Sequence, residues 1–436
     1  ATTGTDKGVL VALATGRLFC FCRLTETRMN RPRLVMVGNG MAGVRTLEEL
    51  LRLAPDLYDI QVFGAEPHPN YNRILLTPVL AGEQRFEDIV LNDQDWYRQH
   101  GIRLHLGSKV VHIDRARRRV IAEDGSEAAY DRLLLATGSR PFIPTLPGHD
   151  LAGVIGYRDI ADTRAMLDAA ERYRHAVVVG GGLLGLEAAN GLRQRGMQVS
   201  VVHRGEWLLD RQLDRTAGEL LQRSLEARGI RFRLAATTER LLGGEDGRVR
   251  TVCLQNGERL PAELVVMATG IRPNAELAEA AGLPCRQGIR VDDTLQTFDP
   301  RIYAVGECVS HRGISYGLVA PLFEQARVCA THLARLGIGR YAGSLLATRL
   351  KVTDIDLFSA GDFSGDAGTQ SITLSDPTRG IYRKLVVRND RLVGACLFGD
   401  SADSAWYQRL IREGCSIAGC RERLMFGEAQ ETRHAG

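Results

Sequence analysis

Three glycines with dinucleotide-binding spacing are the residues of this chain with the clearest chemical potential. Gly38, Gly40 and Gly43 form a G-x-G-x-x-G motif directly after the apolar run 34–37. In such a motif the first glycine permits a tight turn, the second lets a pyrophosphate approach the backbone, and the third lets the next helix pack on the strand. That helix offers free N–H groups to phosphates, and Glu66 offers a carboxylate to a ribose. The motif therefore predicts a dinucleotide site, against the alternative of a glycine-rich turn that only serves packing.

The G-x-G-x-x-G motif occurs twice in the chain. A second G-x-G-x-x-G occupies 180–185, directly after the apolar run 176–179, and a helix is expected from there to about residue 195. Each copy is followed at some distance by A-T-G-x-R-P, at 136–141 and at 268–273. Such self-similarity indicates the repeat of a whole domain. We therefore expect two dinucleotide sites, against the alternative that the second copy is a decayed structural repeat.

The two copies differ where the ribose would bind. In the second copy the strand 199–202 ends at His203 and Arg204, where the first copy is followed by an acid. An arginine there can bind the 2′-phosphate of NADPH. Alternatively, Glu206, a little further along, could replace the ribose-binding acid of the first copy. The residues alone do not decide whether the second site prefers NADH or NADPH.

Length and composition favour an ordinary globular protein of about two to four domains. The formal net charge of the 436 residues is +4, which gives no reason to invoke nucleic acid or a membrane surface. No apolar run is long enough to span a membrane. The nine cysteines include no C-x-x-C pair, so free thiols in a reducing cytoplasm and no metal site are expected. Residues 1–28 are interpreted as an extension outside the fold.

Further candidate residues lie between and after the two motifs. Prolines and asparagines predict a loop over 67–78, in which Arg73 either faces a flavin or its phosphates or is a plain surface arginine. A strand before Gly306 and Glu307 again ends in a glycine and an acid. A helix is expected to begin near Ala320, where its N-terminus could stabilise negative charge on a bound ring.

Strand patterns also outline the rest of the chain. Short strands are expected at 102–106, 110–113, 120–122 and 133–135. The sequence pattern changes beyond about residue 340, where no further G-x-G-x-x-G motif occurs. There we expect strands at 357–360, 371–374, 384–387 and 392–398 and a helix over about 402–413, which together predict a smaller α+β domain.

At this point the sequence resembles the flavoprotein family with two dinucleotide sites, the pyridine nucleotide-disulfide oxidoreductase-like family of rubredoxin and ferredoxin reductases. It is most similar to the amino-terminal flavin region of the assimilatory NAD(P)H nitrite reductase large subunit. The resemblance runs from about 31 to 427. The segments that carry it are 37–43, 71–76, 136–141, 180–189, 211–214, 268–273, 303–308, 318–321 and 350–352.

The resemblance implies an α/β fold with two Rossmann-like domains, the NAD(P) domain being inserted in the FAD domain. It places the FAD domain at 29–150 and 268–340, the NAD(P) domain at 151–267, and a small α+β domain at 341–436. It implies FAD in the first site. The expected FAD contacts are Gly38, Gly40, Met41, Ala42, Gly43, Glu66, Arg73, Ala136, Thr137, Gly138, Arg140, Gly306, Glu307, Val319 and Ala320.

In the second site the resemblance implies NAD(P)H, with NADH modestly preferred. The expected contacts are Gly180, Gly182, Leu183, Leu184, Gly185, Glu187, His203, Arg204, Thr269 and Gly270. Glu187 and Arg73 are the residues expected beside the reacting rings, the alternative for Glu187 being a helix-surface carboxylate. The wider family often places a lysine against the flavin, but the matching position here is Pro78. No cysteine lies between Cys22 and Cys253, so a redox-active cysteine pair is not expected in the first half of the FAD domain.

The resemblance implies an NAD(P)H-dependent FAD oxidoreductase that passes electrons to an iron–sulfur or haem protein, with nitrate or nitrite assimilation as the expected pathway. It also allows a homodimer. The alternative enzyme is an NADH oxidase or a generic rubredoxin or ferredoxin reductase. The alternative outside enzymes is a nucleotide-binding redox sensor.

Overall fold

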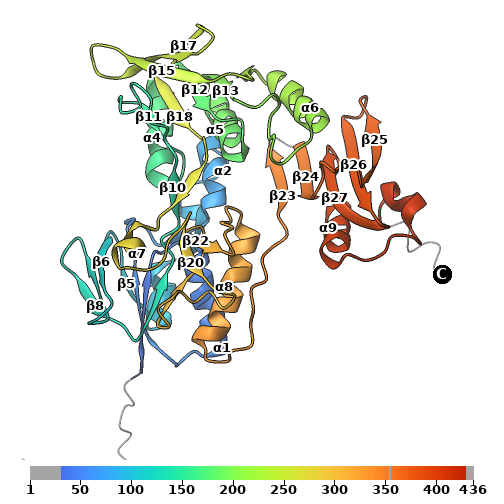
Figure 1. The fold of residues 1–436 in the computed structure, drawn as a ribbon. Helices are drawn as coiled ribbons and strands as arrows, with labels where there is room; N and C mark the ends of the chain where they lie inside the picture. The colour runs from blue at the N-terminus through green and yellow to red at the C-terminus, as the bar shows by residue number, and fades with distance from the viewer. Residues whose placement is uncertain (1–30, 353–354, 429–436) are drawn as a thin grey trace, which may run out of the picture. The chain divides into compact units, whose positions relative to one another are not determined.

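The first sheet joins two distant stretches of the chain. The structure, a computed structural model, describes residues 31–352 and 355–428, so the predicted extension 1–28 lies outside the described residues. Five parallel strands follow the order β21-β9-β1-β2-β5. They are β1 (Arg33–Val37), β2 (Asp59–Phe63), β5 (Arg103–His105), β9 (Arg132–Leu135) and β21 (Ile302–Ala304). The helices α1 (Met41–Leu53) and α8 (Val319–Leu333) lie side by side beside this sheet (Figure 1).

The second sheet is built wholly from the chain between these two stretches. Its order is β11-β18-β12-β13-β14, and all its strands are parallel. Its strands are β11 (Val154–Ile155), β12 (His175–Val179), β13 (Gln198–Val202), β14 (Arg231–Arg233) and β18 (Leu264–Met267). The helices of this part are α4 (Ile160–Arg172), α5 (Leu183–Gln194) and α6 (Arg215–Glu226). The predicted fold, with one Rossmann-like domain inserted in another, is confirmed.

Smaller sheets complete these two parts. They comprise β3 (Asn70–Tyr71) with β4 (Val90–Asn92), β6 (Val110–Asp114) with β7 (Arg119–Ala122) and β8 (Glu127–Ala129), β10 (Ser139–Pro141) with β19 (Ile271–Pro273), β15 (Thr238–Gly243) with β16 (Val249–Leu254) and β17 (Arg259–Pro261), and β20 (Ile289–Val291) with β22 (Val309–His311). Short helices occur at α3 (Gln94–Gln99), α7 (Glu276–Ala280) and η2 (Glu87–Ile89). The strands β10 and β19 are the two A-T-G-x-R-P repeats, and they pair with each other, Arg140 opposite Arg272.

The prediction of a loop over 67–78 is wrong for the second half of this segment. The segment contains β3, the 3₁₀ turn η1 (Arg73–Leu75) and then the helix α2 (Leu76–Ala81). Pro78 does not break this helix because it lies in the first turn, where a backbone N–H has no intrahelical partner to lose.

The helix α2 packs on α5 of the second sheet. Gly191 of α5 leaves the space that Leu80 fills, since a Cβ at Gly191 would lie 2.7 Å from the Leu80 Cγ. Arg195 donates from Nε to the Leu80 carbonyl at 2.6 Å and from Nη2 to the Val79 carbonyl at 3.0 Å. The two Rossmann-like parts therefore meet along the helix pair α2 and α5. Arg195 of the region after α5 caps carbonyl groups at the C-terminal end of α2.

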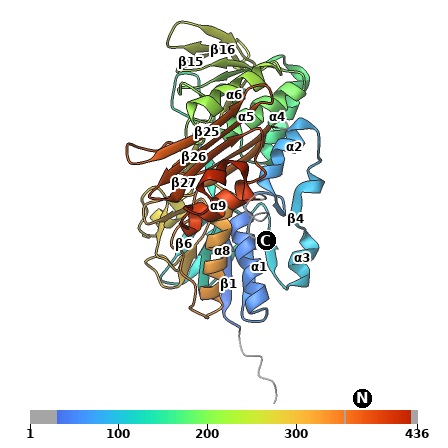
Figure 2. The same cartoon turned by 90° about the vertical axis from the view of Figure 1, so that its right-hand side faces the viewer.

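The C-terminal part is an antiparallel sheet with one main helix (Figure 2). Its order is β23-β24-β27-β26-β25. The elements are β23 (Ala347–Val352), β24 (Ile355–Gly361), β25 (Gln370–Asp376), β26 (Ile381–Arg388), β27 (Arg391–Phe398), α9 (Ser404–Glu413) and η3 (Arg421–Phe426). The predicted α+β character is confirmed, and β23 is a strand that we did not predict.

This sheet contacts the second Rossmann-like part. The Tyr382 hydroxyl donates to the Asp214 carboxylate at 2.5 Å, and Asp214 is also the N-cap of α6. No helix within the described residues is long and apolar enough to cross a membrane.

Candidate functional site

The first glycine motif has the geometry of a phosphate cradle. Gly38 has φ +104°, and a Cβ there would lie 2.1 Å from the Ala136 carbonyl oxygen. A Cβ on Gly43 would lie 2.8 Å from the Ala136 Cβ, so both glycines permit close packing. Gly40 is different, because a Cβ there would meet nothing within 4 Å. Gly40 is the N-cap of α1 and supplies no side-chain cap, so the first N–H groups of the helix, beginning at Met41 and Ala42, have no capping side chain.

The second motif repeats this geometry at the start of α5. Gly180 has φ +123°, and its Cβ would lie 2.2 Å from the Ala268 carbonyl oxygen. A Cβ on Gly185 would lie 2.0 Å from the carbonyl oxygen of Gly180. Gly182, the N-cap, has open space in front of it and no side-chain cap, directly before Leu183 and Leu184. The two motifs therefore share the same glycine geometry and an uncapped helix N-terminus.

Two buried polar atoms near the first glycine motif have no hydrogen-bond partner in the protein. The Asn70 side chain donates to the Asn39 carbonyl at 3.0 Å, and the Tyr97 hydroxyl donates to Asn39 Oδ1 at 2.7 Å. Asn39 Nδ2 and Asn70 Oδ1 are nevertheless buried without a hydrogen-bond partner. Buried polar atoms are normally paired, so these two fit a ligand with polar atoms of its own, such as FAD.

The predicted acid Glu66 and the predicted Arg73 lie together. Arg73 forms an ion pair with Glu66, and the Tyr71 hydroxyl donates to the other Glu66 oxygen at 2.7 Å. Arg73 also donates from Nη1 to the Arg158 carbonyl at 3.1 Å. The guanidinium is thus held against the first site rather than free on the surface.

Glu307 is the second acid of this site and is 8% exposed. It accepts a hydrogen bond from the Ser139 hydroxyl at 2.6 Å and forms an ion pair with Arg158. The backbone N–H of its neighbour Gly306 donates to Gln325 of α8 at 2.9 Å. Sequence reasoning missed Arg158, because nothing in the motifs indicates that this residue reaches Glu307, 149 positions away.

Other predicted residues lie at the crossover between the two parts. The Thr137 hydroxyl donates to the Asn274 carbonyl at 2.6 Å, and the Thr269 hydroxyl donates to the Phe142 carbonyl at 2.6 Å. Gly138 and Gly270 both have positive φ. Arg140 donates to Asn274 and pairs with Glu276. The contacts of Arg140 thus lie where the chain passes between the two parts. Among the described residues no contact joins Arg140 to Glu66 or Glu307.

Val319 and Ala320 open α8, as predicted. The N-cap Leu318 has no side-chain hydrogen bond to the helix, so the first N–H groups of this helix are also uncapped. A helix N-terminus of this kind stabilises negative charge nearby.

Glu187 lies on α5 at the contact with α2. The Thr77 hydroxyl donates to Glu187 Oε2 at 3.0 Å, and burial raises the pKa of Glu187 to about 7, a rise that this hydrogen bond limits. The Tyr157 hydroxyl lies 3.4 Å from the Thr77 hydroxyl. Glu187 is therefore a partly exposed carboxyl group that contacts α2, and the motifs did not indicate Thr77 or Tyr157 as its neighbours.

The ribose end of the second site has a different arrangement from the one predicted. His203 Nδ1 accepts a hydrogen bond from the Gly181 N–H at 3.2 Å, and burial lowers the pKa of His203. A neutral ring in this role holds the glycine loop and has no charge for a 2′-phosphate. Glu206 forms an ion pair with Arg215. Arg204 is exposed and, among the described residues, has no hydrogen-bond or ion-pair partner.

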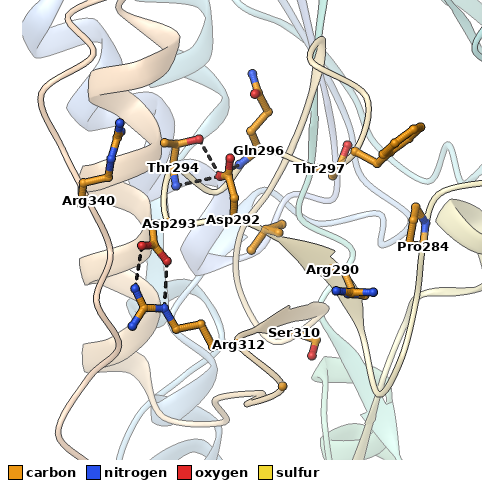
Figure 3. Close-up of a pocket in the computed structure, with 13 residues that line it drawn as sticks. Pro284, Arg290, Asp292, Asp293, Thr294, Gln296, Thr297, Ser310, Arg312 and Arg340 are labelled. Atoms are coloured by element: carbon orange, nitrogen blue, oxygen red, sulfur yellow. Dashed lines mark hydrogen bonds and ion pairs between the residues drawn. The ribbon is translucent and has the colours of Figure 1, made fainter.

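The structure also has a cavity of about 850 Å³, whose lining side chains are drawn in Figure 3. Its wall includes Arg290, Ser310 and Arg340, and in it Arg312 pairs with Asp293 at 2.6 Å. None of the predicted site residues lines this cavity. The described residues hold no cluster of His, Cys, Asp and Glu suited to a metal ion, and no disulfide joins any two of the described cysteines.

Comparisons with known proteins agree with this geometry. Residues 32–332 match the family model described as pyridine nucleotide-disulphide oxidoreductase, and residues 347–415 match the rubredoxin NAD⁺ reductase C-terminal domain. A nitrite reductase [NAD(P)H] of Bacillus subtilis is 50% identical over 390 residues, which cover 89% of this chain and 48% of that protein. The assimilatory nitrate reductase electron transfer subunit of the same organism is 46% identical over 383 residues, which cover 88% of this chain and 49% of that protein.

Among solved structures, the covalent putidaredoxin reductase–putidaredoxin complex matches with a TM-score of 0.79 and 27% identity, covering 88% of this chain and 94% of the matched one. The chain spans about half the length of the two Bacillus relatives. Proteins of the matched family use FAD and NAD(P)H, the cofactors expected from the two motifs. The chain therefore belongs to the pyridine nucleotide-disulphide oxidoreductase family, and it is an oxidoreductase with two Rossmann-like nucleotide sites.

Proposed function

We propose that this chain takes electrons from NADH and passes them to a separate iron–sulfur or haem protein in nitrate or nitrite assimilation. The observation that carries the proposal is the pair of uncapped helix N-termini behind Gly40 and Gly182, which present two phosphate cradles in one chain. The similarity to the electron transfer subunit of assimilatory nitrate reductase supports the choice of pathway.

The first cradle is assigned to FAD. Its pyrophosphate would lie at Gly40, Met41 and Ala42, between Gly38 and Gly43, while Glu66 and Glu307 would bind hydroxyl groups of the ribose and ribityl chain. The α8 N-terminus at Val319 and Ala320 would stabilise negative charge on the ring. Bound FAD supplies the ability to accept a hydride and to release its two electrons singly.

The second cradle is assigned to the pyridine nucleotide. Its pyrophosphate would lie at Gly182, Leu183 and Leu184, and Glu187 would lie near the nicotinamide. The proposed domains are those of the sequence prediction: FAD at 29–150 and 268–340, NAD(P) at 151–267, and the C-terminal domain from 341. The resemblance still favours NADH, whereas the exposed Arg204 would favour a 2′-phosphate.

The proposed partner is an iron–sulfur or haem redox protein. One chain of the covalent putidaredoxin reductase–putidaredoxin complex has the same fold as this chain. This likeness supports a separate protein acceptor. Within 31–352 and 355–428 the structure holds no redox-active disulfide that could accept the electrons instead. The chain could also act as a homodimer, and a cytoplasmic location remains a prediction.

Stopped-flow absorbance under anaerobic conditions tests flavin reduction by NADH, and steady-state assays with oxygen or with an added redox protein as the acceptor test turnover. NADH should bleach the flavin rapidly, turnover with oxygen alone should be slow, and a ferredoxin or a nitrate or nitrite reductase component should raise it well above the oxygen rate. Fast oxygen turnover that no redox protein alters would favour the NADH oxidase. A flavin that NADH does not bleach would favour the sensor.

A further inference from the structure

The segment 203–214, between β13 and α6, holds the backbone of the second glycine motif. The Leu209 N–H donates to the Gly181 carbonyl at 3.1 Å, and the Gly181 N–H donates to His203 Nδ1 at 3.2 Å. Both polar groups of the Gly181 backbone are therefore bound to this segment. Gly181 directly precedes Gly182, the N-cap of α5, so the segment bears on the start of that helix.

Side-chain packing fixes the same segment against the motif. A Cβ on Gly181 would lie 2.8 Å from His203 Cγ and 3.0 Å from Leu208 Cδ2. Leu209 is 1% exposed and has φ +54°, a left-handed conformation that is unfavourable for a residue with a Cβ. Such a backbone persists only where the surrounding contacts hold it, so the shape of this segment depends on what it packs against.

The C-terminal sheet holds the last residue of the segment. The Tyr382 hydroxyl of β26 donates to Asp214 Oδ2 at 2.5 Å, and Lys384 Nζ, two positions along the same strand, lies 3.6 Å from that oxygen. The other Asp214 oxygen accepts a hydrogen bond from the Ala217 N–H at 3.0 Å and so caps α6. Tyr382 is 4% exposed, and burial together with the hydrogen bond to Asp214 raises the pKa of its phenol, so the hydroxyl remains a donor.

Short steps connect Asp214 to the glycine motif. The N–H of its neighbour Leu213 donates to the Leu209 carbonyl at 2.7 Å, and the Leu209 N–H in turn donates to Gly181. Apolar packing runs beside these hydrogen bonds, because Leu209, Leu213 and Tyr382 belong to one buried cluster. An unbroken series of contacts therefore leads from the C-terminal sheet to the second glycine motif.

We propose that Asp214, held by Tyr382 and Lys384, is a positioning residue for the pyridine nucleotide. Through the segment 203–214 the C-terminal sheet holds the glycine loop in its binding arrangement and so raises the affinity for the nucleotide. The inference rests on the proposed function, which assigns the nucleotide pyrophosphate to Gly182 and the residues after it. A loop that is held in this arrangement beforehand loses less conformational freedom on binding.

The coupling acts in both directions. A contact that favours nucleotide binding is itself favoured by the bound nucleotide, to the same extent. The pyridine nucleotide therefore stabilises the contact between Asp214 and the C-terminal sheet. The competing interpretation is that this contact only attaches the sheet to the second Rossmann-like part, in which case its loss would leave nucleotide affinity unchanged.

Hydrogen exchange of the FAD-loaded full chain tests the first step. The double variant Tyr382→Phe, Lys384→Met removes the hydroxyl and the ammonium group and keeps Asp214 as the cap of α6. Backbone N–H groups in 203–214 should exchange at least about fivefold faster in this variant than in wild type. The matched control is Tyr407→Phe, which removes a buried hydroxyl that donates to the Leu424 carbonyl at 2.8 Å in the same sheet domain. Wild-type exchange of 203–214 in the double variant would overturn the proposal.

Calorimetric titration of the oxidised, FAD-loaded protein with NAD⁺ and with NADP⁺ tests the effect on the site. The double variant should bind the nucleotide that wild type prefers at least about fivefold more weakly. FAD affinity, measured by fluorescence titration of the FAD-free protein, should stay at the wild-type value. In steady-state assays with ferricyanide as the acceptor, the rise in KM for the reduced nucleotide should exceed any fall in kcat. Tyr407→Phe should match wild type in both affinities.

The outcomes separate the positioning role from a structural one and from the proposed function. Wild-type nucleotide affinity in the double variant, or equal losses of nucleotide and FAD affinity, would overturn the positioning role and leave the proposed function standing. If the double variant does not fold, wild-type nucleotide affinity in Tyr382→Phe alone would equally overturn it. A wild-type chain that binds neither NAD⁺ nor NADP⁺ would overturn the proposed function and the positioning role with it.

Discussion

Arg158 forms an ion pair with Glu307, although the two side chains come from different Rossmann-like parts of the molecule. Glu307 follows β21 of the first sheet, whereas Arg158 follows β11 of the second sheet. The Arg158 backbone carbonyl also accepts a hydrogen bond from Arg73. One residue of the inserted part therefore holds two groups that are proposed to contact FAD, so FAD binding and the junction of the two parts should be coupled.

Replacing Arg158 by methionine should destabilise the FAD-free protein by about 2–3 kcal/mol, because it leaves the Glu307 carboxylate buried and unpaired. This value is smaller than that for a fully buried pair because the Arg158 side chain is 21% exposed. Urea unfolding measures it. The double variant Arg158→Met, Glu307→Gln should recover most of the loss, and failure to recover it would show that the destabilisation has another cause.

Gly40→Ala should lower FAD affinity at least about tenfold, or 1.4 kcal/mol, while the FAD-free fold keeps its stability. The added Cβ meets open space in the FAD-free structure, but it enters the space proposed for the pyrophosphate. Gly38→Ala is the matched contrast, since a positive φ and a contact of 2.1 Å to Ala136 should destabilise the fold itself by about 1–3 kcal/mol or more. Fluorescence titration of the FAD-free protein with FAD, together with urea unfolding, distinguishes the two. Equal FAD affinity in Gly40→Ala and wild type would contradict the assignment of this cradle.

Arg204→Ala should lower kcat/KM for NADPH about tenfold more than for NADH, since a charged hydrogen bond to a phosphate contributes about 1.5–3 kcal/mol. We expect NADH to remain the better substrate of the wild-type chain. Steady-state kinetics with both nucleotides measures this, and Arg223→Ala on the exposed face of α6 serves as the control. A wild-type preference for NADPH that disappears in Arg204→Ala would show that NADPH is the natural donor.

Local motifs predicted more of this site than long-range contacts did. The fingerprints could be predicted because Gly38 and Gly180 must have positive φ and approach a carbonyl closely, which only a glycine permits. The contact of Arg158 with Glu307 could not, because it joins segments from two different sheets. His203 has the position of a ribose contact in the sequence, yet its ring turns inward to the Gly181 N–H.

The helix α2 was missed for a related reason. Prolines and asparagines favour a loop when they are considered alone, but Pro78 falls in a first helical turn, and packing on α5 stabilises that short helix. The hydrogen bond between Thr77 and Glu187 depends on this packing, so it too could not be predicted from either segment.

The pH dependence of stability should distinguish wild type from Glu187→Gln. Burial raises the pKa of Glu187 from an ordinary 4.5 to about 7 in the folded state. Between these two values the folded chain binds more protons at Glu187 than the unfolded chain, so this group makes the free energy of unfolding fall as the pH rises. The loss levels off above the folded pKa, and it amounts to about 1.4 kcal/mol for each unit by which the two pKa values differ.

Glutamine removes this titration, so the stability of Glu187→Gln relative to wild type should increase from about pH 5 to about pH 8. Urea unfolding of the FAD-free protein across this range measures the difference. Glu219→Gln on α6, where the side chain is 43% exposed, is the control and should follow wild type. If Glu187→Gln also follows wild type at every pH, an ionised Glu187 costs the fold nothing, and its position at the contact of α2 and α5 does not shift its pKa.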